Sequence, residues 1–189
     1  MKLTYTLTNI GWADVYLEIG HKEIYMEPSY LSEPLIDLTR AIELLIPCLN
    51  EPDETRDIVT FEWDSEPAIH SWKITKISNE KIRIEIVLYV DGIKTLPGEL
   101  LLNEVCGLNE FVQELVASLE NLLKKHGLVG YRKQWYRQDF PISSYLQLKY
   151  YLENREDFPI EIKSTDGWIE HIGSNLNEEI ALIKKSIML

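Results

Sequence analysis

The strongest constraint on the fold is the alternation of apolar and polar residues between positions 82 and 90. The apolar positions of this segment are Ile82, Ile84, Ile86, Leu88 and Val90. A period of two residues is that of a β-strand with one buried face. The dipeptide Asp91-Gly92, a strong signal for a tight turn, follows at once, and residues 99–106 can return as the next strand. This stretch therefore predicts a pair of antiparallel strands.

Further alternating segments and two segments of helical period complete the pattern. The additional predicted strands cover residues 3–8, 13–19, 24–26, 58–63 and 69–77. Apolar stripes at helical spacing predict helices over 33–46, with Ser32 as its cap and Pro47 near its end, and over 109–126. Because the turns are short and the helices come in separate blocks, the predicted class is α+β. We expect a mainly antiparallel sheet of six to seven strands with two main helices packed on one face.

The composition of the sequence changes after residue 130. Two further helices are predicted near 143–154 and 177–187, and the length of 189 residues fits one domain with an attachment. We therefore divide the chain into an α+β sheet domain, 1–130, and a C-terminal helical appendage, 131–189, packed on the same domain. The basic and aromatic segment 131–137 opens this appendage. We expect its cations to pair with the acidic N-terminal region; a groove for single-stranded nucleic acid is the alternative.

Charge is distributed unevenly along the chain. Of the formal net charge of −12, residues 1–70 contribute −10, from fourteen Asp and Glu against four Lys and Arg. A field of this sign repels duplex nucleic acid and anionic membrane surfaces, and it attracts basic proteins. An acidic surface that serves only solubility is the alternative.

The densest acidic stretch supplies the candidate binding residues for a basic protein partner. They are Glu51, Asp53, Glu54, Asp57, Glu62, Trp63, Asp64 and Glu66. Trp63 is either an aromatic anchor for that partner or, with Trp72 on the next strand, part of a cross-strand pair in the core. No glycine lies between residues 50 and 66, so the stretch lacks the turn of a calcium-binding loop, and no metal site is predicted.

No constellation of residues predicts catalysis or a cofactor. Cys48 and Cys106 both lie beside apolar runs and are interpreted as small buried side chains in a reducing compartment, with a disulfide left open. The four histidines are far apart, and no glycine-rich phosphate loop is present. The N-terminal segment lacks the apolar run of a signal peptide, and no window is apolar enough to span a membrane. The expected location is the cytoplasm.

Several short motifs resemble a family of uncharacterised bacterial proteins. They are Gly11-Trp12-Ala13, Ser29-Tyr30-Leu31-Ser32 at the start of the first helix, Trp63 with Glu66-Pro67, and Gly130-Tyr131-Arg132, so the resemblance covers roughly residues 1–140. It implies a fold but no activity and no catalytic residue. As a small acidic α+β domain, the chain is also similar in class to immunity proteins that neutralise bacterial toxins.

Three functional hypotheses remain open. The first is a cytoplasmic protein-binding module, of which a toxin-neutralising immunity protein is one form. The second is a small-molecule binding protein or enzyme with a pocket between sheet and helices, using Trp12, Tyr30, Trp72 or Trp135. The third is a structural homo-oligomer joined through the apolar C-terminal segment 180–189.

Overall fold

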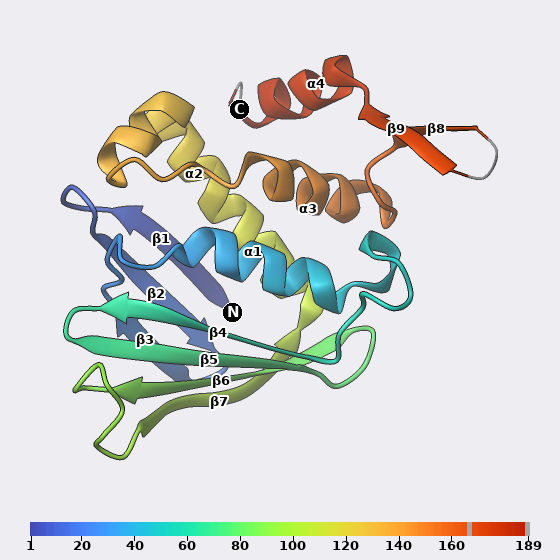
Figure 1. The fold of residues 1–189 in the computed structure, drawn as a ribbon. Coiled ribbons are helices and arrows are strands. Elements are labelled where there is room, and N and C mark those ends of the chain that lie inside the picture. The colour runs from blue at the N-terminus through green and yellow to red at the C-terminus, as the bar shows by residue number, and fades with distance from the viewer. Residues whose placement is uncertain (166–167, 188–189) are drawn as a thin grey trace.

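The computed structural model describes residues 1–165 and 168–187 (Figure 1). It is an α+β fold with three antiparallel sheets. The first sheet, in the order β1-β2-β3, is formed by β1 (Lys2–Leu7), β2 (Ala13–Ile19) and β3 (Lys22–Met26). The second, in the order β4-β5-β6-β7, is formed by β4 (Ile58–Ser65), β5 (Ala68–Lys76), β6 (Lys81–Tyr89) and β7 (Glu99–Gly107). The third is a hairpin of β8 (Ile160–Thr165) and β9 (Trp168–Ser174).

The described residues form four α-helices, arranged in layers over these sheets. They are α1 (Pro34–Leu45), α2 (Leu108–Gln134), α3 (Ile142–Asn154) and α4 (Leu176–Ile187), and a short 3-10 helix, Pro47–Leu49, follows α1. In Figure 1, α1 and α2 lie above both main sheets, α3 lies above these two helices, and α4 with the β8–β9 hairpin is outermost. The α+β class and the helices near the predicted positions are confirmed.

The prediction of one sheet of six to seven strands is wrong, because the main strands divide into sheets of three and four. A physical reason is visible at β1, whose outer edge is covered by α2. The Ser118 hydroxyl donates to the Leu3 carbonyl oxygen at 2.7 Å, and the Leu3 amide donates to the Glu114 carboxylate at 3.2 Å. These helix side chains occupy backbone groups that another strand would otherwise pair.

Helix α1 packs against β4, and hydrogen bonds join the segments that flank these two elements. The predicted cap, Ser32, does not cap α1; its hydroxyl instead accepts a hydrogen bond from the Asp64 amide at 2.9 Å. The Arg56 amide donates to the Leu44 carbonyl oxygen at 2.8 Å. α2 thus occupies backbone groups at the outer edge of β1, whereas α1 packs against β4 and the segment before α1 bonds to the end of that strand. The two sheets meet where β7 contacts β3 and β2.

The core joins the two main sheets through aromatic side chains. Trp63 and Trp72, on adjacent strands, have ring centroids 4.6 Å apart, and Tyr5 of β1 meets Trp63 edge-on at 6.5 Å. Trp135, at the end of α2, meets the same tyrosine at 6.1 Å. These rings are essentially buried, so the space between sheets and helices is filled by side chains.

The C-terminal region differs from a purely helical appendage, because it contains the β8–β9 hairpin. Residue 130 also lies inside α2, which bends at Gly127 (φ 62°) and continues to Gln134. Helix α4 has a single buried side chain, Ser186, whose hydroxyl is hydrogen-bonded to that of Tyr145 on α3. The outermost layer is therefore held by fewer buried contacts than the layers beneath it.

Candidate functional site

The acidic residues predicted as one binding surface are separated by a strand. Glu51, Asp53, Glu54 and Asp57 precede β4 and form the group we call the acidic loop; all four are exposed. Glu62, Asp64 and Glu66 lie toward the other end of β4 and in the turn after it. At the rise of an extended chain, Asp57 and Asp64 are separated by about 23 Å. The sequence thus brings together two groups that the strand holds apart.

Trp63 does not form part of an exposed surface. Its side chain has no solvent exposure and packs against Trp72 and Tyr5 in the core. Alternation along β4 explains this position, since Glu62 and Asp64 point to the outer face while Trp63 points inward. The interpretation of Trp63 as an anchor for a partner is therefore wrong, and the alternative of a buried aromatic pair with Trp72 is confirmed.

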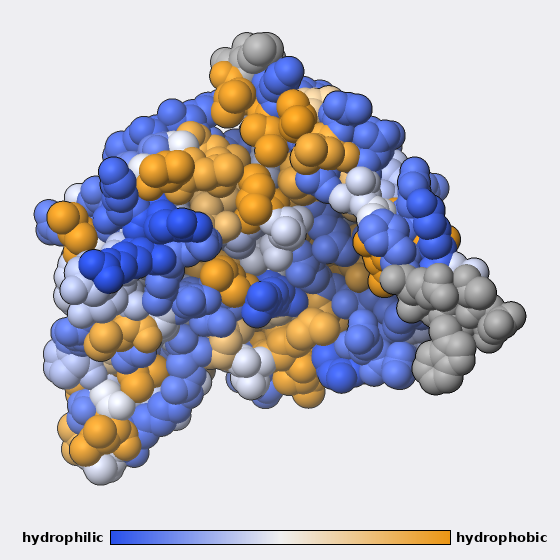
Figure 2. All heavy atoms as spheres, turned by 45° about the horizontal axis from the view of Figure 1, so that its top comes forward, coloured by the Kyte–Doolittle hydropathy of each residue, from blue (hydrophilic) through white to orange (hydrophobic). Residues whose placement is uncertain are grey.

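With Trp63 buried, the exposed apolar side chains next to these carboxylates come from another segment, the loop between β6 and β7. Three large apolar side chains of this loop, and a fourth at the start of β7, are more than half exposed. They are Val90 (51%), Ile93 (77%), Leu96 (52%) and Leu100 (56%). In Figure 2, orange and blue side chains share the lower left projection, where this end of the sheet lies in Figure 1. We call these four residues, together with Glu62, Asp64 and Glu66, the tip patch.

The β6–β7 loop is held in one shape by the carboxylate of Asp91. This carboxylate accepts hydrogen bonds from the amides of Lys94 at 3.0 Å, Thr95 at 2.6 Å and Leu96 at 3.0 Å, and also from the Thr95 hydroxyl. The bond from that hydroxyl, with help from the amides, lowers the pKa of Asp91 below its usual range. A carboxylate with four donors fixes the backbone that carries Ile93 and Leu96.

Two glycines allow the loop to lie close to its neighbours. Gly92 has φ 66°, and a Cβ atom there would overlap the carbonyl oxygen of Pro67 in the β4–β5 turn. A Cβ atom on Gly98 would lie 2.8 Å from the Tyr89 ring. The loop and the turn that carries Glu66 are thus in direct contact, which places apolar and acidic residues side by side.

Few of these carboxylates are neutralised by the chain itself. Lys94 forms an ion pair with Glu62 and lies 5.2 Å from the centre of the Tyr89 ring. Within the described ranges, no other acidic residue of the tip patch or the acidic loop forms an ion pair. The expectation that segment 131–137 neutralises them is wrong, since Arg132 pairs with Asp139. Most of the acidic charge therefore faces solvent.

The two cysteines have different environments, and both are free thiols. Cys106 is buried, and burial raises its pKa to about 12. Cys48 is exposed, which corrects its assignment as a buried side chain; partial burial still raises its pKa, with the charge of Asp157 adding to the shift. A thiol with a raised pKa is a poor nucleophile near neutral pH.

One side-chain pair resembling a catalytic dyad escaped the sequence analysis. The Ser65 hydroxyl and His70 Nδ1 lie 2.9 Å apart across the β4–β5 hairpin. Burial lowers the pKa of His70 to about 4, so the ring is neutral at pH 7. No carboxylate among the described residues forms a hydrogen bond with the histidine, and the ring is 5% exposed. The pair joins two strands. Sequence reasoning could have found it only by locating the β4–β5 turn, because the turn determines which residues of the two strands lie opposite each other.

The predicted pocket between sheet and helices is filled. Trp72 and Trp135 are buried in the core, Tyr30 packs on Tyr136 with ring centroids 4.4 Å apart, and Trp12 borders a shallow polar depression of about 380 Å³. These four aromatics do not converge on a common cavity. No group of three or more potential metal ligands occurs among residues 1–165 and 168–187.

In comparisons with protein-family models, curated proteins and solved structures, nothing matches this chain. The family resemblance and the likeness to immunity proteins therefore stay predictions. None of the described helices is both long enough and apolar enough to cross a bilayer.

Proposed function

We propose that this protein is a binding module for a basic protein partner and that the tip patch is the docking surface. The observation that carries the proposal is the contact between an apolar loop held by Asp91 and the β4–β5 turn, which carries Glu66. Exposed apolar clusters rimmed by charge are typical of protein interaction sites. Ile93 and Leu96 would fill apolar recesses of the partner, while Asp64 and Glu66 would meet cations around them.

The acidic loop has a different part in this proposal. A partner bound at the tip patch through a small interface would not touch the four carboxylates of this loop. They still add to the electrostatic field that attracts a basic protein. Such a module would inhibit a basic enzyme by covering its surface, which is how an immunity-type protein would act in the cytoplasm. Inhibition of this kind needs no catalytic residue on the present chain.

The experiment compares immobilised wild-type protein with three variants in affinity capture from the native cell lysate. One carries Ile93→Ser and Leu96→Ser, the second carries Asp64→Asn and Glu66→Gln, and the control carries Glu51→Gln and Glu54→Gln. We expect one basic protein to be retained by wild type and control and to be lost from the Ser variant. We also expect weaker retention at about 300 mM salt than at about 50 mM, because salt screens exposed charges.

Purification of the captured protein then allows a direct titration. The apolar variant should raise the dissociation constant by about 10-fold or more, as expected for residues at the centre of an interface. Equal binding of the Ser variant and wild type would refute the tip patch as the docking surface. Equal binding at both salt concentrations would refute the electrostatic part of the proposal.

A further inference from the structure

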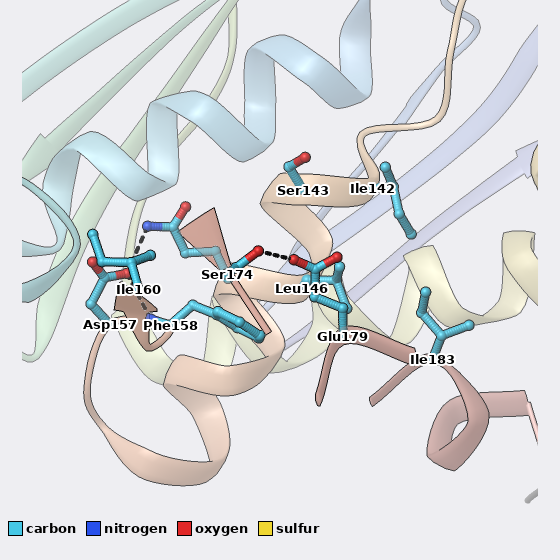
Figure 3. A pocket seen from close by; sticks show the side chains of 10 residues that line it. Ile142, Ser143, Leu146, Asp157, Phe158, Ile160, Ser174, Glu179 and Ile183 are labelled. Atoms are coloured by element: carbon cyan, nitrogen blue, oxygen red, sulfur yellow. Dashed lines mark hydrogen bonds between the residues drawn. The ribbon is translucent and has the colours of Figure 1, made fainter. Parts of the chain in front are cut away.

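A second surface feature, unrelated to the tip patch, is a cavity beneath the C-terminal layer. It has a volume of about 410 Å³ and lies between α3, α4 and the β8–β9 hairpin (Figure 3). This volume is within the range of small-molecule sites, about 300–1,000 Å³. Near the C-terminal end of α4, Ser186 contacts Tyr145 of α3, and Lys185 pairs with Glu153 at 2.8 Å.

Apolar side chains from three segments form much of the cavity lining. Ile142 and Leu146 come from α3, Phe158 from the segment before β8, and Ile183 from α4. Phe158 is buried against Tyr150, with ring centroids 5.1 Å apart, so the wall it forms is firmly placed. A hydrocarbon group entering here would exchange water for contact with these side chains.

Two carboxylates interrupt this apolar lining at separate places. Asp157 accepts hydrogen bonds at Oδ1 from the Gln147 amide group at 2.9 Å and from the Phe158 backbone amide at 2.7 Å. Glu179 accepts one at Oε1 from the Ser174 hydroxyl, drawn as a dashed line in Figure 3. In the part of the chain that the structure describes, neither carboxylate forms an ion pair, and no hydrogen bond reaches Asp157 Oδ2 or Glu179 Oε2.

The fixed carboxylates limit the chemistry of a ligand for this cavity. Hydrogen bonds to one oxygen of each group hold the carboxylate in place and leave the second oxygen as an acceptor. An anionic ligand would be repelled, and a purely apolar one would leave both charges without a partner. A ligand with a positively charged donor and a hydrocarbon body satisfies both parts of the lining.

We propose that this cavity binds a small aliphatic amine, with its ammonium group on Asp157 or Glu179 and its hydrocarbon chain against Leu146, Phe158 and Ile183. This binding is independent of the tip patch, which lies on another part of the fold. The carboxylates determine selectivity for a cation, and the apolar walls favour cations that carry a hydrocarbon body.

The test is titration of the full chain with n-hexylammonium chloride, followed by calorimetry and by amide chemical shifts. Hexanol supplies the same body without charge, and methylammonium supplies the charge without the body. We expect n-hexylammonium to bind at least about 5-fold more tightly than either control compound, as a charge-assisted hydrogen bond in a partly exposed site allows. The amide shifts should map to α3, α4 and residues 157–160.

Isosteric variants distinguish binding in the cavity from nonspecific attraction of a cation to the acidic chain. Asp157→Asn and Glu179→Gln together should abolish the preference for n-hexylammonium over hexanol. Glu156→Gln, an exposed neighbour that does not line the cavity, should change the affinity less than about 2-fold. Equal binding of hexanol and n-hexylammonium to wild type would overturn the proposal, as would an equal loss of affinity in Glu156→Gln. Ser143→Trp, which fills the rim from an exposed position, should block binding without unfolding the chain.

Discussion

Replacing Ser118 by Ala tests the idea that α2 closes the edge of the three-stranded sheet. The Ser118 hydroxyl donates a buried hydrogen bond of 2.7 Å to the Leu3 carbonyl oxygen. Without it, this oxygen is left without its donor from α2, which costs about 1–3 kcal/mol. The better helix propensity of Ala returns about 0.5 kcal/mol. The net expectation is a loss of about 1–2 kcal/mol in the free energy of unfolding.

Urea unfolding followed by tryptophan fluorescence measures this loss, because Trp63, Trp72 and Trp135 are all buried in the core. For a chain of this length, the melting temperature should fall by about 2–8 °C. Hydrogen exchange should also become faster at the Leu3 amide, which is bound by Glu114 on the same helix.

Gln113→Ala is the matched control, since Gln113 lies on the exposed face of α2 and its replacement changes helix propensity alone. It should alter stability by less than about 0.5 kcal/mol. If Ser118→Ala were as stable as this control, the hydroxyl would contribute nothing at the sheet edge. The account of why the strands divide into two sheets would then lose its support at β1.

Three other predictions concern the pH dependence of stability, the tip loop and the thiols. The pKa of His70 is lowered to about 4 in the folded protein, so the unfolded state binds the proton first as the pH falls below about 6.5. Stability should therefore decline by about 3 kcal/mol between pH 6.5 and 4 through this group, and His70→Gln should remove that part of the decline in urea titrations. Gly92→Ala should destabilise the fold more than Gly20→Ala in thermal melts, because both have positive φ but only Gly92 meets a neighbouring carbonyl oxygen; equal effects would contradict the close packing of the loop. With iodoacetamide at pH 8, mass spectrometry should show slow modification of Cys48 and none of Cys106 until urea is added, and early modification of Cys106 would contradict its burial.

Local periodicity was sufficient to predict most elements of the fold. The β1–β3 meander, the pairing of β6 with β7 and helices close to α1, α3 and α4 agree with the expected positions. The same periodicity could have assigned Trp63 to the core, since it shares its face of β4 with Val59. Alternation of Ile160 and Ile162 with charged residues was also an available signal for β8.

The division into two sheets and the composition of the tip patch could not be read from local pattern. Whether a strand edge pairs with another strand or with a helix depends on contacts between residues more than 100 positions apart, such as Leu3 and Ser118. The acidic residues of 51–66 are close together in the sequence, but β4 runs between them and separates them in space. Their apolar partners, Ile93 and Leu96, belong to a loop that carries no acidic run.

The contact between β1 and α2 also affects the nascent chain during its synthesis. Leu3 and Ser118 are separated by 115 positions, and ribosomes add about 5–20 residues per second, so about 6–23 s pass between their syntheses. The β1–β3 meander is complete at Met26, so for most of that interval its edge strand has been made while the helix that closes it has not. A nascent chain of this protein is therefore open to strand pairing with neighbouring chains until its second half is synthesised, and early binding by a chaperone would protect it.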